Sequence, residues 1–181
     1  MTVVLDSGAL ITACKFAVGG ELIVDGILRG CRVLVEQAVE DEVAVLGAGY
    51  ADGIAAAERI AQGSLEVAAV RERKWRRHLA AYALGAGDVG SLELCGQSDD
   101  QPTLVTDDYL AFVVGTRLGL TVQMLPDLLV ALVECGELTA QLAEAMLQTM
   151  RPRYRTGVIE HSVVALEEVA SHAEGARPSP S

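Results

Sequence analysis

The sequence predicts an α/β fold in which a central, mostly parallel sheet is covered on both faces by helices. Short apolar runs typical of buried strands alternate with longer segments of helical periodicity along most of the chain. Such alternation favours parallel strands joined by helices. Hydrophobic residues make up 51% of the 181 residues, which suits a compact core in about one domain.

The strands are assigned to short apolar runs that end at turn residues or acids. The first run, 3–6, ends in Asp6, and the other predicted strands lie at 31–35, 64–70, 103–106 and 120–124. The segments between and after them have helical spacing, and glycines such as Gly136 separate them. The predicted helices are 8–17, 19–30, 37–46, 51–63, 71–84, 88–96, 107–119, 126–135, 139–150 and 157–172.

The C-terminal third is helical without further strands. We therefore expect one domain over 1–150, a helical extension packed on it over 151–171, and a disordered tail over 172–181.

Composition excludes several classes of protein. No apolar run reaches the roughly 18 residues of a membrane span, and the N-terminus lacks the basic start of a secretion signal, so we expect a cytoplasmic protein. The four cysteines (Cys14, Cys31, Cys95, Cys135) are scattered, which argues against structural zinc and favours small core side chains. The net charge of -11 repels polyanions, so any nucleic-acid function needs a local basic surface or bound cations.

The glycines of "GAGDVGSLEL", residues 85–94, have the spacing of a dinucleotide-binding loop. Such a loop follows a strand directly, whereas the residues before Gly85 have helical character. An acid inside a pyrophosphate cradle would also repel its ligand, and Asp88 is such an acid. We therefore interpret the glycines as a helix stop, and a nucleotide-binding regulatory domain would require a strand immediately before Gly85.

Two predicted strands end in an acid. Asp6 follows the first strand and Asp107 follows the strand 103–106, so both carboxylates would share one crevice if the strands are neighbours. The alternative is that Asp6, Asp107 or Asp108 only cap the helices that follow.

Glu42 lies on the apolar face of its predicted helix, next to Val39 and Val43. A carboxylate there needs a partner or a metal, unless the helix is rotated and Glu42 lies at the solvent boundary. Four separated acids at predicted helix starts or on an inward helix face suggest an oxygen-ligand site for Mg²⁺ or Mn²⁺, made of Asp6, Glu42, Asp88 and Asp107. Such a site activates water and neutralises phosphodiester charge.

In order and spacing, four segments resemble the PIN domain, a family of metal-dependent ribonucleases. They are "VVLDSGALI", "VEQAVEDEVA", "GAGDVGSLEL" and "LVTDDYLAFVVGTRLGL", within residues 2–123. Residues 125–150 are similar to the helical C-terminal extension of a toxin-like PIN subfamily. The resemblance implies a three-layer α/β/α sandwich with a mostly parallel sheet and C-terminal helices.

The resemblance also implies roles for particular residues. Asp6, Glu42, Asp88 and Asp107 would be the catalytic metal ligands, supported by Ser7, Thr106 and Asp108. One position departs from the pattern, because Gly90 stands where the subfamily often has a second Glu. Either Asp88 acts alone, Glu93 substitutes one turn later, or the site is weakened or inactive.

The segment "RERKWRRH", 71–78, is strongly basic in an otherwise acidic chain. It could bind RNA phosphates, with Trp75 stacking on a base, or be a solvated helix face whose Trp anchors it to the core. The RNA-binding candidates are Arg71, Arg73, Lys74, Trp75, Arg76 and Arg77. A smaller basic segment, "RPRYR", lies at 151–155, and either segment could instead dock an acidic partner.

These observations favour a Mg²⁺- or Mn²⁺-dependent endoribonuclease. The resemblance adds that the protein could be the toxin of a toxin-antitoxin pair, with an antitoxin protein as partner or a second copy in a homodimer. The alternative is a catalytically silent PIN-like module that docks protein or RNA.

Overall fold

A five-stranded, all-parallel sheet forms the centre of the protein in a computed structural model that describes residues 1–175, with side chains to His172. The strand order is β5-β4-β1-β6-β7. The strands are β1 (Thr2–Leu5), β4 (Arg32–Glu36), β5 (Leu65–Ala68), β6 (Thr103–Val105) and β7 (Val122–Gln123). The predicted α/β fold with a parallel sheet is confirmed.

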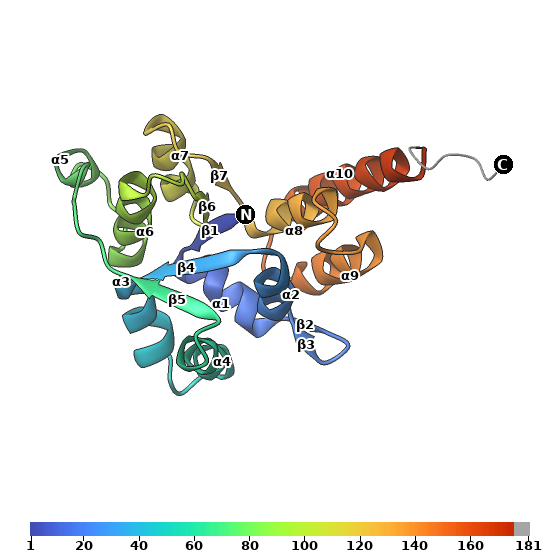
Figure 1. The fold of residues 1–181 in the computed structure, drawn as a ribbon, viewed down its shortest axis with the longest axis horizontal. Helices are drawn as coiled ribbons and strands as arrows, with labels where there is room; N and C mark the ends of the chain where they lie inside the picture. The colour runs from blue at the N-terminus through green and yellow to red at the C-terminus, as the bar shows by residue number, and fades with distance from the viewer. Residues whose placement is uncertain (176–181) are drawn as a thin grey trace.

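Helices cover both faces of the sheet and continue beyond one end of it (Figure 1). On one face lie α1 (Ser7–Lys15), α2 (Ile23–Gly30) and α4 (Ala51–Ala61), and on the other lie α6 (Ala86–Gln97) and α7 (Tyr109–Arg117). The remaining helices are α3 (Gln37–Glu40), η1 (Asp41–Val45), α5 (Arg76–Leu79), α8 (Leu125–Glu134), α9 (Ala140–Met150) and α10 (Thr156–Gly175).

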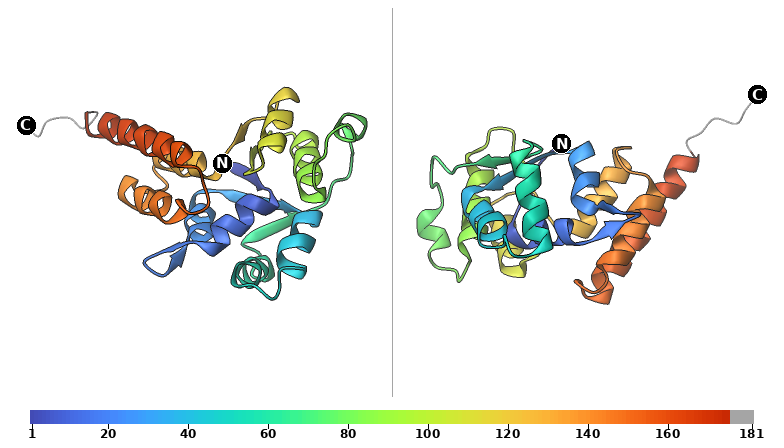
Figure 2. Two further views of the ribbon diagram at one scale, coloured as in Figure 1. Left: turned by 180° about the vertical axis from the view of Figure 1, so that it is seen from behind. Right: turned by 90° about the horizontal axis from the view of Figure 1, so that it is seen from below.

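The alternating side chains of the strands build a separate core on each face. Val3 and Leu5 of β1 belong to the larger cluster, which extends to α8, α9 and α10, whereas Val4 belongs to a smaller cluster with Leu92 of α6. Successive strand residues point to opposite faces, so each strand contributes to both cores. The C-terminal helices therefore pack on the domain as an extension of its larger core (Figure 2).

The predicted helix 19–30 is wrong in its first part. A two-stranded hairpin, β2 (Ala17–Val18) and β3 (Glu21–Leu22), precedes α2. Gly19 and Gly20 form its turn with φ of +61° and +88°. A two-residue hairpin turn needs positive φ at both central residues, which glycine adopts without strain.

The predicted helix 71–84 is also wrong, because only Arg76–Leu79 is helical. The backbone before it is bound by side chains of α6: Gln97 Oε1 accepts from the Arg71 amide, and the Glu93 carboxylate accepts from the Trp75 amide. In a helix, Arg73 and Arg77 would repel each other at i, i+4.

Two smaller expectations also need correction. Helix α10 continues to Gly175, so 172–175 are helical rather than part of a tail, and 176–181 lie outside the described residues. Cys14, Cys31 and Cys95 are buried as expected, whereas Cys135 is exposed. Within the described residues, no helix combines the length and apolarity needed to cross a membrane.

Candidate active site

The predicted acids meet at the carboxyl ends of the central strands. A cavity of about 250 Å³ lies there. Its walls come from the starts of α1, α6 and α7, from η1 and from the α9–α10 connection. The lining residues are Asp6, Ser7, Gly8, Glu42, Gly85, Gly87, Asp88, Asp107, Asp108 and Arg153. The sequence predicts a shared crevice for Asp6 and Asp107 if their strands are neighbours, and β1 and β6 are neighbours.

Asp6 is the most buried of these acids, with 1% of its surface exposed. It caps α1, accepting from the Ala9 amide at 2.7 Å. Burial raises the pKa of Asp6 from 3.8 to about 7, opposed by hydrogen bonds from Ala9 and the Thr106 hydroxyl and assisted by the charges of Asp107 and Asp88. Asp6 therefore caps α1, as the alternative expects, and also lines the cavity.

Asp107 is held by side chains from two other elements. Tyr154 Oη donates to its Oδ1 at 2.6 Å, and Thr12 Oγ1 donates to its Oδ2 at 3.0 Å. Burial raises the pKa of Asp107, while these hydrogen bonds lower it in part. Its neighbour Asp108 is exposed and caps α7 through the Ala111 amide at 2.8 Å. Buried Thr106 accepts from the Asp108 amide at 3.1 Å, which fixes the loop that carries both acids.

Glu42 lines the cavity, but its side chain does not lie on a core-facing side of its helix. It is exposed, so the expectation of a core-facing side chain is wrong and the solvent-boundary alternative is right. Residues 41–45 form a π-helical turn, which changes the direction of side chains relative to a regular α-helix. The partner of its carboxylate is Ser7, whose Oγ donates to Glu42 Oε2 at 2.7 Å.

Asp88 lies in the first turn of α6 and accepts from the Gly85 amide at 3.0 Å. Burial raises the pKa of Asp88, and the charges of Asp108 and Glu42 raise it further. Gly87 allows this close approach, since a Cβ there would lie 2.6 Å from Ser7 Oγ. Because α5 and a turn, not a strand, precede Gly85, the nucleotide-binding interpretation of "GAGDVG" is wrong.

The donor chemistry of the cavity suits a hard divalent cation. All five acids offer carboxylate oxygens, which Mg²⁺ and Mn²⁺ prefer, and like charges act on Asp6 and Asp88. Among the residues described, however, no three His, Cys, Asp or Glu side chains stand close enough together to hold a metal ion as a ready-made group. The residues fit the cation by chemistry, and their spacing is wider than a closed coordination shell.

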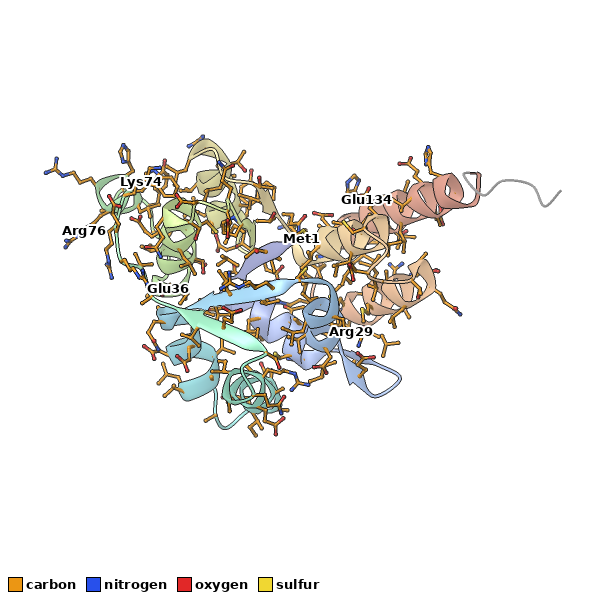
Figure 3. All side chains as sticks on the ribbon, in the orientation of Figure 1. Met1, Arg29, Glu36, Lys74, Arg76 and Glu134 are labelled. Atoms are coloured by element: carbon orange, nitrogen blue, oxygen red, sulfur yellow. The ribbon has the colours of Figure 1, made fainter. Side chains whose placement is uncertain are left out.

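The carboxylate of another acid, Glu36, fills the space that a side chain at position 90 would need. A Cβ on Gly90 would lie 2.3 Å from Oε2 of Glu36, a buried residue at the end of β4 that accepts from the Ala38 amide. Glu93 does not substitute in the acid cavity, because its buried carboxylate accepts from Trp75 and lines a neighbouring cavity. Figure 3 shows Glu36 at the end of its strand.

The basic segment lies beside the C-terminal half of α6. Trp75 packs against Gly96, where a Cβ would lie 2.2 Å from the ring, and Lys74 Nζ lies 5.1 Å from the ring centroid. This packing favours the anchoring interpretation of Trp75. Arg71, Arg73, Lys74, Arg76 and Arg77 are exposed and form no ion pair within the described part of the chain. Figure 3 shows Lys74 and Arg76 at this edge of the molecule.

Three further residues contact or line the site without a motif that predicts them there: Thr12, Arg153 and Tyr154. Arg153 lines the acid cavity and donates from Nε to Thr12 Oγ1 at 3.3 Å. The basic run "RPRYR" was a signal, but nothing in it indicates that a segment so far along the chain from Asp107 returns to that acid's cavity.

Comparison with known proteins identifies the family. A family model described as "DUF3368: PIN domain" matches residues 2–168. No curated protein matches the chain. One solved structure, a domain of a functionally unknown protein from Methanocaldococcus jannaschii DSM 2661, shares 18% identity over 68% of this chain and 89% of that chain, with a TM-score of 0.43. Since the family model spans nearly the whole length, the chain belongs to the PIN-domain family.

Proposed function

We propose that the protein is a metal-dependent ribonuclease that hydrolyses RNA phosphodiester bonds. PIN domains are typically nucleases, which supports the general class. The observation that carries the proposal is the cavity at the carboxyl ends of β1 and β6, which gathers Asp6, Glu42, Asp88, Asp107 and Asp108. Most of its lining side chains are carboxylates, which suits metal-assisted hydrolysis, in which a bound cation activates water.

In this proposal, Asp6 and Asp107 bind the central Mg²⁺ or Mn²⁺, and Asp88 and Glu42 complete its surroundings or orient water. A bound divalent cation supplies activation of water and neutralisation of charge on the phosphodiester. Ser7 orients Glu42 through its 2.7 Å hydrogen bond, and Thr106 fixes the Asp107–Asp108 loop. The exposed cations of 71–77 would hold the RNA outside the cavity.

The first test is calorimetric titration with Mn²⁺ of the wild type, Asp6→Asn and Asp107→Asn. The matched control is Asp100→Asn, because Asp100 is exposed and does not line the cavity. We expect the wild type and the control to bind Mn²⁺, and both cavity variants to lose binding while remaining folded by circular dichroism. RNA cleavage should follow the same pattern and stop on addition of EDTA. Cleavage that persists in Asp6→Asn would refute the proposal.

A catalytically silent PIN-like module is the second candidate. The observations in its favour are Gly90, which stands where the subfamily often has an acid, and the wide spacing of the acids. A wild type that binds RNA, binds no Mn²⁺ and cleaves nothing would support this candidate over the nuclease.

The toxin role, the antitoxin partner and the homodimer are proposals that follow from the subfamily resemblance. The toxin role is tested by expressing the protein in a host cell. The wild type should slow growth of the cell, and Asp6→Asn should not. Size-exclusion chromatography with light scattering would detect the homodimer.

A further inference from the structure

Among the described residues, Arg153 is the one cation that lines the acid cavity, and it comes from outside the strands and helices that carry the acids. Arg153 lies in the connection between α9 and α10, which the helical extension brings back to the start of α1. Its Nε donates to Thr12 Oγ1 at 3.3 Å, and its Nη2 lies 3.8 Å from where a Cβ on Gly8 would be. The guanidinium is therefore held over the first turn of α1, beside Asp6 and Asp107.

Within the described residues, no ion pair neutralises the charge of Arg153. Other arginines of the extension and the core form ion pairs, such as Arg151 with Glu160 and Arg59 with Asp25. Arg153 forms none with the residues described, although it lies among five carboxylates. Its side chain is exposed, so the remaining N–H donors face the solvent of the cavity.

The charge of Arg153 lowers the pKa of Asp107 without forming a contact ion pair, so the remaining donors of the guanidinium can bind a phosphate oxygen. Its planar fork donates two parallel hydrogen bonds to phosphate, which a carboxylate-lined cavity otherwise repels. The neighbouring Tyr154 donates a hydrogen bond to Asp107. The connection between α9 and α10 is therefore held at the site by Tyr154, and Arg153 is left to bind a ligand.

We propose that Arg153 is a substrate-binding residue that contacts a non-bridging oxygen of the RNA phosphate entering the acid cavity. The proposal rests on the proposed function for the identity of the ligand as RNA. It assigns to the C-terminal extension a direct part in the site, in addition to covering the larger core.

The test is binding of a fluorescein-labelled single-stranded RNA, followed by anisotropy in Ca²⁺, which shares the charge and oxygen preference of Mg²⁺. The variants are Arg153→Ala and Arg153→Lys, and the matched control is Arg155→Ala. Arg155 is exposed on the same connection and does not line the cavity. All three changes lie at exposed positions, so the variants should fold, and circular dichroism of each variant verifies this.

We expect Arg153→Ala to weaken RNA binding by about tenfold, as removal of a charge-assisted hydrogen bond does. The slope of log affinity against log salt should also fall by about 0.7, the share of one phosphate contact. Arg153→Lys should recover part of the affinity, and Arg155→Ala should match the wild type. In Mn²⁺, Arg153→Ala should lower kcat/KM for cleavage.

Equal RNA affinities of Arg153→Ala and Arg155→Ala would overturn the inference. Tighter RNA binding or faster cleavage by Arg153→Ala would also overturn it, because Arg153 would then block the cavity rather than bind RNA. A wild type that binds no RNA would overturn it as well. RNA binding that depends on Arg153, without any RNA cleavage, would refute only the nuclease proposal. The ratio of RNA affinities between wild type and Arg153→Ala does not depend on hydrolysis.

Discussion

At the scale of single residues, the site depends on carboxylates that the protein buries without a full set of counter-charges. Asp6 is the clearest case, because its surroundings favour the protonated form. This burial costs stability in the free protein, and a cation at the site would recover it.

The first prediction concerns the pH dependence of stability in EDTA. The pKa of Asp6 is raised from 3.8 to about 7 in the native state, so the native state holds this proton where the unfolded state has lost it. The contribution of Asp6 to the free energy of unfolding is therefore fully present below its unfolded-state pKa of 3.8. This contribution is lost as pH rises to about 7, at up to about 1.4 kcal/mol per pH unit.

Asp6→Asn has no carboxyl proton to lose at this position. Its free energy of unfolding, relative to that of the wild type, should therefore increase as pH rises from 3.8 to about 7. Urea unfolding of both proteins at each end of the window measures the difference. A difference that stays constant with pH would contradict the assignment.

The second prediction concerns Tyr154, which donates to Asp107 Oδ1 at 2.6 Å. Tyr154→Phe keeps the ring and removes the donor, so Asp107 loses one of its orienting partners. We expect Mn²⁺ affinity to fall by about tenfold or more, as for other outer partners of metal ligands. Calorimetry measures this, with exposed Tyr50→Phe as control. Unchanged affinity in Tyr154→Phe would show that the hydroxyl does not position Asp107.

At the scale of elements, α6 is the helix that connects the cavity to the basic segment. Its glycines face neighbours that need the space: Gly87 faces Ser7, Gly90 faces Glu36 and Gly96 faces Trp75. The N-terminal half of α6 carries Asp88 to the cavity, while its C-terminal half holds the segment before α5 through Glu93 and Gln97.

The third prediction tests the attachment of the basic segment to α6. In Gly96→Ala, the new Cβ would overlap the rigid Trp75 ring, so the ring must move out. We expect a loss of about 1–3 kcal/mol in unfolding free energy and a red shift of fluorescence from the protein's one Trp. The matched control is Gly157→Ala, since a Cβ there meets nothing within 4 Å. An unshifted spectrum in Gly96→Ala would show that Trp75 does not pack there.

At the scale of the whole molecule, the charge is distributed unevenly. The chain carries a net charge of -11, yet five exposed cations gather within 71–77 and form no ion pairs with the rest of the described protein. Such a distribution lets a polyanion approach one edge while the remainder repels it.

The fourth prediction tests this distribution with a double variant, Arg76→Ala with Arg77→Ala. If the segment binds RNA, the affinity should fall, and the salt slope should decrease by about 0.7 for each phosphate that the variant no longer binds. The control, Arg117→Ala with Arg155→Ala, changes the net charge equally at exposed positions elsewhere. Equal effects in both proteins would mean that only net charge matters and that the segment is no RNA site.

Much of the fold could be predicted from local patterns. Strands and helices with strong periodicity, such as those around Asp6 and Asp107, lie where the sequence places them. The errors came where a remote group decides the local structure. The backbone before α5 follows hydrogen bonds from α6, and the exposure of Glu42 follows the π-helical turn of η1.

The sequence by itself determined the parallel sheet and the family, because periodicity and the order of short acid motifs are local properties of the chain. It also predicted that Asp6 and Asp107 would lie together if their strands are neighbours, and the pairing of β1 with β6 meets that condition. Only the tertiary structure decided that Arg153 and Tyr154 join these acids, that Glu36 fills the space beside Gly90, and that Glu93 turns away. Those contacts depend on how α9, α10 and α6 pack on the sheet, and packing between distant segments leaves no periodic signal in the chain.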